Sequence, residues 1–102
     1  MSGQVWIGLV EVIPHTGNDI FGDAPGGFSN VLAQAGSFAE YKAKVVAALD
    51  EEGLTVVEIE DAEPLRERQA HFHVPDNILA IADEAAERVA WDTFYIFESE
   101  GD

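Results

Sequence analysis

The sequence predicts a single α+β domain over residues 1–102: a two-layer sandwich with a mostly antiparallel sheet of four to five strands and two helices on one face. Three observations predict it. The chain has 102 residues, the usual size of one domain, and 47% of them are hydrophobic, which is enough to build a core. Short runs rich in β-branched residues alternate with two amphipathic helical segments. Their order (strand, strand, helix, strand, short strand, helix, strand) favours a ferredoxin-like arrangement with an extra hairpin strand.

The first strand is expected over 4–13, where β-branched residues dominate. Apolar side chains alternate onto both of its faces, so we expect both to be covered, or nearly so. Gly8 indicates a bulge or a close approach of another backbone segment. After a long loop at 14–27, the segment 28–35 fits either a strand or a helix. We assign a strand paired with the first, because Gly36 and a new helix cap follow it.

The first helix is predicted over 38–52. Ser37 and Glu40 have capping-box spacing, in which the Ser37 hydroxyl accepts a helix N–H and Glu40 reaches back to the Ser37 N–H. Gly53 ends the helix, because glycine readily takes the left-handed conformation. Glu40 and Lys44 form an exposed i,i+4 pair. The apolar stripe has helical spacing and consists of Phe38, Tyr41, Val45, Ala48 and Leu49.

The second half of the chain is predicted to add two strands, a helix and a last strand. The strand 54–61 places Val57 and Ile59 toward the core, and the segment 62–69 connects onward because Pro64 does not fit a central strand. A short strand follows at 70–74. A helix capped by Asp76 runs over 77–90, with a stripe of Ile78, Ile81, Ala82, Ala85 and Val89. The last strand spans 91–98, and 99–102 form a frayed acidic tail.

Charge and composition exclude several classes of function. Five basic and 20 acidic residues give a net charge of −15, which argues against binding to nucleic acid or to anionic membranes. The same charge favours encounter with a basic protein partner. The absence of cysteine excludes disulfides and thiolate chemistry. With no membrane helix and no signal peptide indicated, we expect a cytoplasmic protein.

The motif "AHFHVP" at 70–75 holds His71 and His73. On a strand, this i,i+2 spacing places both rings on one face, where they could bind zinc with a third ligand or act as a base. His15, Asp76 and Glu63 are candidates for that ligand, but no spacing selects one of them. We favour the simpler interpretation of two outer-face histidines with Phe72 in the core, and we expect no metal and no cofactor.

The stretch 58–64 concentrates four carboxylates. It lacks the spacing of an EF-hand loop. It therefore indicates either a solvated strand face or a docking surface for a basic partner. The residues of this candidate surface are Glu58, Glu60, Asp61 and Glu63.

The glycine-rich loop 16–27 has neither a P-loop nor a dinucleotide-binding pattern, and Asp19 and Asp23 would repel a phosphate. Its alternatives are an ordinary hairpin loop or a recognition lid in which His15, Asp19 and Phe21 meet a ligand. The strand aromatics could in turn line a cavity between helices and sheet, although core packing is their commoner role. They are Trp6, Trp91, Phe94, Tyr95 and Phe97.

Two functional hypotheses follow. The first is a non-catalytic interaction or regulatory module, of the kind that immunity proteins represent, docking a basic partner. The alternative is a small dimeric, cofactor-free enzyme or ligand binder with an aromatic cavity and a histidine in its wall. We favour the first and assign no catalytic residue. Apolar residues left on an open sheet face predict a homodimer in either case.

Overall fold

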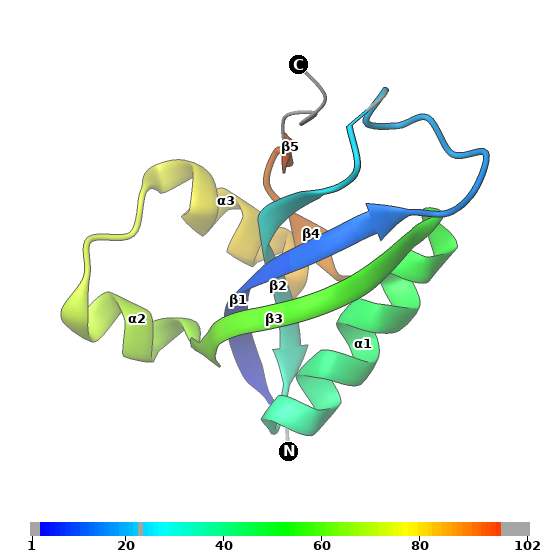
Figure 1. Cartoon of the computed structure of the whole chain (residues 1–102). Coiled ribbons are helices and arrows are strands. Elements are labelled where there is room, and N and C mark those ends of the chain that lie inside the picture. The colour runs from blue at the N-terminus through cyan, green and yellow to red at the C-terminus, as the bar shows by residue number, and fades with distance from the viewer. Residues whose placement is uncertain (1–2, 23, 97–102) are drawn as a thin grey trace.

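A computed structural model describes residues 3–22 and 24–96 (Figure 1). It confirms an α+β fold in which an antiparallel sheet packs against three helices. The strands follow the order β3-β1-β2-β4, and β5 also pairs with β2. The strands are β1 (Gln4–Pro14), β2 (Gly27–Ala35), β3 (Leu54–Pro64), β4 (Ala90–Trp91) and β5 (Tyr95–Ile96). The helices are α1 (Phe38–Glu51), α2 (Leu65–His71) and α3 (Asp76–Ala85).

The helices cover both faces of the sheet, which corrects the expectation that they share one face. Helix α1 lies on one side, and α2 and α3 lie on the other (Figure 1). Tyr41, Val45 and Leu49 of α1 pack on a cluster that includes Val10 and Val31. Leu65 of α2 and Ile78 of α3 pack on Ile7 and Leu32. The physical reason is that β1 is apolar on both faces, and each face needs its own cover. The ferredoxin-like arrangement is not confirmed.

The first two strands form the predicted hairpin. The register runs from Gln4 opposite Ala35 to Val12 opposite Gly27, so 28–35 is a strand, as assigned. Gly8 marks a close approach, because a β-carbon on it would lie 2.7 Å from the Tyr41 hydroxyl. The hairpin of β1 and β2, which are neighbours in the sequence, therefore forms the centre of this core, and α1 packs over it.

Helix α1 begins and ends where the sequence predicts. The Ser37 hydroxyl accepts a hydrogen bond from the Glu40 N–H at 3.2 Å. The Glu40 carboxylate, however, accepts from the Gly36 N–H at 2.8 Å and not from the Ser37 N–H. This bond is the main reason that the pKa of Glu40 is lowered. Gly53 has a φ of 81° and ends the helix.

Strand β3 differs from the prediction because it is bulged twice. Its register with β1 shifts between Ile7 and Leu9 and again between Glu11 and Val12. Each bulge moves the alternation of side chains by one residue. The side chains packed against the α1 cluster are therefore Val56, Ile59 and Ala62, whereas Val57, predicted to be in the core, is 52% exposed.

The segment that follows β3 was predicted least well. Residues 65–71 form α2, so the short strand expected at 70–74 is wrong. Asp76 is the first residue of α3 and makes no side-chain cap bond. Pro75 instead precedes the helix, which suits a residue without an N–H. The helix ends at Ala85, and the predicted last strand is reduced to β4 and β5, with 97–102 outside the described residues.

Candidate functional site

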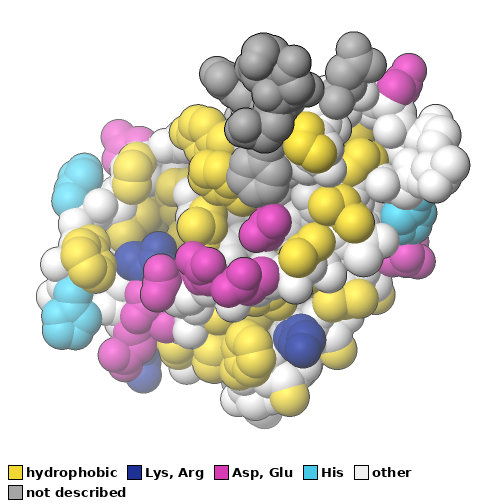
Figure 2. All heavy atoms as spheres, viewed as in Figure 1, with side chains coloured by type: hydrophobic (Ala, Val, Ile, Leu, Met, Phe, Trp, Pro, Cys, Tyr) yellow, Lys and Arg dark blue, Asp and Glu magenta, His cyan; other side chains and the backbone are white. Residues whose placement is uncertain are grey.

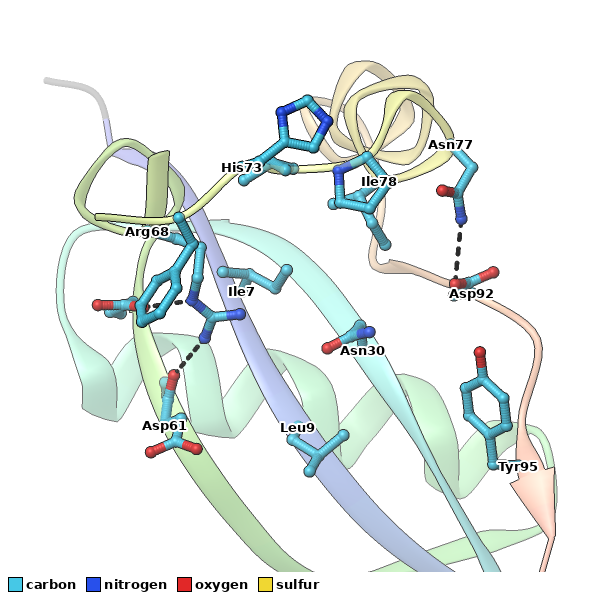
Figure 3. A pocket seen from close by; sticks show the side chains of 15 residues that line it. Ile7, Leu9, Asn30, Asp61, Arg68, His73, Asn77, Ile78, Asp92 and Tyr95 are labelled. Carbon is cyan, nitrogen blue, oxygen red and sulfur yellow. Dashed lines mark hydrogen bonds and ion pairs between the residues drawn. The ribbon is translucent and has the colours of Figure 1, made fainter. Parts of the chain in front are cut away.

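A groove of about 790 Å³ lies on the sheet face that carries α2 and α3 (Figure 3). Its volume falls within the range of small-molecule and peptide-anchor sites. Ile7, Leu9 and Asn30 of β1 and β2 form its floor, and α2 and the α2–α3 connection close one end. The remaining lining residues are Asp61, Ala62, Glu63, Arg68, Phe72, His73, Val74, Pro75, Asn77, Ile78, Asp92 and Tyr95.

Arg68 holds one wall of the groove together. Its guanidinium donates to the Glu63 carboxylate and, at 2.8 Å, to the Asp61 carbonyl (Figure 3). Asp61 has a φ of 55°, an uncommon value for a non-glycine residue, at the bulge of β3 that lies opposite Ile7 and Leu9. The bulge, the carbonyl and the arginine together attach α2 to the edge of the sheet.

Polar and aromatic contacts build the opposite wall. The Asn77 amide donates to the Asp92 carboxylate at 3.2 Å, which links α3 to the segment after β4. Tyr95 stacks on Phe28 with ring centroids 5.6 Å apart and remains 58% exposed. This wall therefore offers an aromatic ring and an amide–carboxylate pair to the groove.

Two further carboxylates of β3 lie next to the groove, on the same face of the sheet. Glu60 lies directly opposite Leu9, and Glu58 directly opposite Glu11, so all four share the groove face. Figure 2 shows acidic side chains gathered across the middle of this view, with hydrophobic side chains on both sides. The pKa of Glu60 is raised, mainly because the Glu58 carboxylate repels its charge and also because Glu58 hydrogen-bonds to it. The like charges on this face are thus incompletely compensated.

The two histidines of "AHFHVP" are not on a strand. His71 is the last residue of α2, and His73 lies in the connection on the groove wall, so the shared face expected from their spacing does not form. Of the proposed third ligands, Glu63 lines the same groove as His73 but is bound to Arg68, and His15 pairs with Asp50 at 3.5 Å. Asp76 is the first residue of α3 and is not among the described lining residues. Within residues 3–22 and 24–96, no group of three or more metal-binding side chains is found.

The loop after β1 is attached to the end of α1 and does not border the groove. The Asn18 amide donates to the Glu52 and Gly53 carbonyls at 3.2 and 2.8 Å. Phe21 is buried in the α1-side core, where it meets Phe94 at 5.4 Å, so it is not an exposed ligand contact. Asp19 is exposed, and Asp23 lies outside the described residues. The recognition role expected of this loop stays a prediction.

The aromatic residues mostly fill the core instead of lining a cavity. Trp6 stacks on Tyr41 at 6.1 Å, and Trp91 lies 6.3 Å from Phe94. Both tryptophans pack against the α1 cluster. Tyr95 alone among the predicted aromatics lines the groove, while Phe97 lies outside the described residues.

The polar groups that line the groove are amides, carboxylates, one imidazole, the Tyr95 hydroxyl and one guanidinium that is already engaged. Such hydrogen-bonding groups beside apolar residues suit the binding of a ligand or of a partner's side chains. Sequence reasoning missed Asn30, Arg68, Asn77 and Asp92, because they border one groove only through the docking of α2 and α3.

Comparison with known proteins gives no relative on which function can be based. The chain matches no protein-family model, and neither a curated protein nor a solved structure shows significant similarity to it. None of the helices in the described part of the chain is long and apolar enough to cross a membrane. Function therefore has to be argued from the groove and the acidic face alone.

Proposed function

We propose that the protein is a non-catalytic interaction module that binds a basic segment of a partner protein on the groove-bearing face. One observation carries the proposal. Glu58, Glu60 and Asp61 lie beside an open groove, while Arg68, the one cation among the described lining residues, is already bound to Glu63. A lysine or arginine supplied by a partner would meet the Glu58 and Glu60 carboxylates, which form no ion pair with another described residue.

Both the carboxylates beside the groove and the net charge of the whole chain favour a basic partner. Bringing Glu58 and Glu60 together costs folding free energy, as the raised pKa of Glu60 indicates. A bound cation would relieve that repulsion, so part of the binding free energy would come from strain already present in the folded protein. The net charge of −15 would speed the encounter.

The irregular edge strand β3 favours a partner that docks through its side chains over a partner that adds a strand to the sheet. β3 is an edge of the sheet, but two bulges and the positive φ of Asp61 interrupt its hydrogen-bonding row. Bulges of this kind protect edges from pairing with another chain. A partner would therefore meet the face of the sheet and not its β3 edge.

Fluorescence anisotropy with a labelled peptide of alternating lysine and leucine residues tests the proposal. We expect binding that weakens steeply between about 20 and 200 mM salt. The double variant E58Q/E60Q should bind about tenfold more weakly. Its matched control, E51Q/E87Q, removes the same charge from exposed positions outside the groove and should bind almost as well as the unmodified protein. Equal loss in both variants would mean that only net charge matters and would refute the site.

A second candidate function is a small-ligand binder or cofactor-free enzyme. The observation in its favour is that His73 stands in the wall of a groove large enough for a metabolite. A panel of metabolites screened by thermal shift tests it. A compound that stabilises the protein, and does so less in H73A, would favour this function over a protein partner.

The homodimer expected from the sequence stays a proposal. Exposed apolar side chains remain on the protein, including Phe72, Tyr95 and Ile96. The open sheet face on which the expectation rested is, however, largely occupied by α2 and α3. Light scattering after size exclusion at tens of micromolar would settle it, since a monomer mass would exclude the dimer.

A further inference from the structure

We infer that the groove seats a bulky apolar side chain of the partner, next to a lysine or arginine that meets Glu60 and Glu58. The recognition element would then be one apolar anchor flanked by basic residues. The inference rests on the proposed function, because it specifies the segment that this same face would bind. Three features of the groove support it.

The groove has an apolar seat. Ile7, Val74 and Ile78 are 2%, 8% and 4% exposed, and their side chains line the base and one end of the groove. Ile7 and Ile78 belong to one buried apolar cluster, and Leu9 follows Ile7 by two residues on β1, on the same face of the sheet. A bulky aliphatic or aromatic side chain placed there would lose contact with water and gain dispersion contacts, which a polar side chain could not do without cost.

Two aromatic residues border this seat from different elements. Phe72 follows α2 and is 64% exposed, and Tyr95 belongs to β5 and is 58% exposed. Exposed aromatic side chains around an apolar depression are typical of the residues that dominate binding energy at protein interfaces. They would lie against the anchor from either side.

The strand register fixes where the partner's cation belongs. Glu60 is the direct neighbour of Leu9 across β1 and β3, and the side chains of such a pair are about 5 Å apart. Glu58 lies two residues further along β3, which is about 7 Å away. Side chains three or four positions apart on a helix are separated by about 5–6 Å. A helical segment with an apolar residue and a lysine at that spacing would match the face.

The charge on this face makes a second copy of the chain a poor occupant. Two copies docked face to face would bring Glu11, Glu58 and Glu60 of one near those of the other. Like charges facing each other across an interface are costly. A basic segment has the opposite effect, so we commit to a basic partner protein as the occupant.

Three labelled peptides separate the anchor from the charge. The first carries one phenylalanine with lysines three and four positions away, the second replaces that phenylalanine by alanine, and the third keeps it but replaces the lysines by glutamate. We expect the first to bind about tenfold more tightly than the second and the third not to bind. The variant F72A/Y95A should remove the advantage of the first peptide and leave the second unchanged. F38A, which trims an exposed aromatic on α1, is the matched control.

The outcomes distinguish this inference from the function on which it rests. Equal binding of the first two peptides, with no effect of F72A/Y95A, would overturn the anchor and leave the acidic docking face standing. Failure of every basic peptide would overturn both. A dimer mass in light scattering that F72A/Y95A converts to a monomer would show that a second copy occupies the groove, and would also overturn the inference.

Discussion

The hydroxyl of Tyr41 fills the space where a side chain on Gly8 would begin. It lies 2.7 Å from the position of a Gly8 β-carbon and donates a hydrogen bond of 2.7 Å to the Val31 carbonyl. Tyr41 is fully buried. The contact lets α1 approach the central strands closely, because one small residue in β1 makes room for a large one in the helix.

We expect G8A to destabilise the fold by about 1–3 kcal/mol, because the added methyl group overlaps the Tyr41 hydroxyl and presses on Ile59 and Ala62. Urea unfolding measures the change. The control G36A adds the same atom where the nearest neighbour is 3.4 Å away and should alter stability by about 0.5 kcal/mol or less. In G8A/Y41F the loss should be smaller than the sum of the single variants, because the clashing oxygen is gone. Additive losses would contradict the contact.

Ionisation of Tyr41 should accompany alkaline unfolding and not precede it. Burial raises its pKa above the ordinary value of about 10, because the phenolate would lose its hydration. The folded state then holds the proton more tightly than the unfolded state, so stability falls as the pH rises above about 10. In Y95F, where Tyr41 is the one remaining tyrosine of the chain's two, phenolate absorbance should rise together with the loss of circular dichroism. A phenolate that forms in a folded protein would refute this.

Neutralising Glu60 should stabilise the protein at neutral pH. Its pKa is raised by Glu58, so the folded state binds the proton more tightly than the unfolded state, and this stability is lost as the pH rises through the raised pKa. We therefore expect E60Q to increase the melting temperature at pH 7 and to have a smaller effect as the pH falls, because Glu60 itself then becomes protonated. E58Q should behave alike, and E87Q, an exposed control, should change little. A lower melting temperature in E60Q would mean that the carboxylate has a favourable partner.

Replacing Asn18 should loosen the loop and the end of α1 together. Its amide satisfies two carbonyls at the end of α1, and its side-chain oxygen accepts from the Ile20 N–H at 3.1 Å. We expect N18A to cost about 1–2 kcal/mol, because the Glu52 carbonyl loses its donor and the Gly53 carbonyl keeps only the His15 N–H. T16A, on an exposed neighbour, is the control. Hydrogen exchange should show faster exchange over 15–22 in N18A alone, and unchanged exchange there would contradict the anchoring role.

The features that the sequence predicted correctly are those decided by interactions between residues close together in the chain. The cap at Ser37, the end of α1 at Gly53 and the strand 28–35 depend on neighbouring residues, and each forms. The apolar pattern on both faces of β1 also predicted that both would be covered. Such signals act within a few residues, which is why one sequence is enough to detect them.

Tertiary packing decided the rest. The bulges of β3 shifted Val57 out of the core, and the docking of residues 65–85 converted a predicted short strand into helix α2 and its connection. The candidate site likewise has one part that the sequence identified and one part that only tertiary packing forms. The sequence identified Glu58, Glu60, Asp61 and Glu63 as an acidic surface, but not the groove beside them. That groove exists because its two walls, one held by Arg68 and the other by the Asn77–Asp92 hydrogen bond, form only once α2 and α3 cover the second face of the sheet.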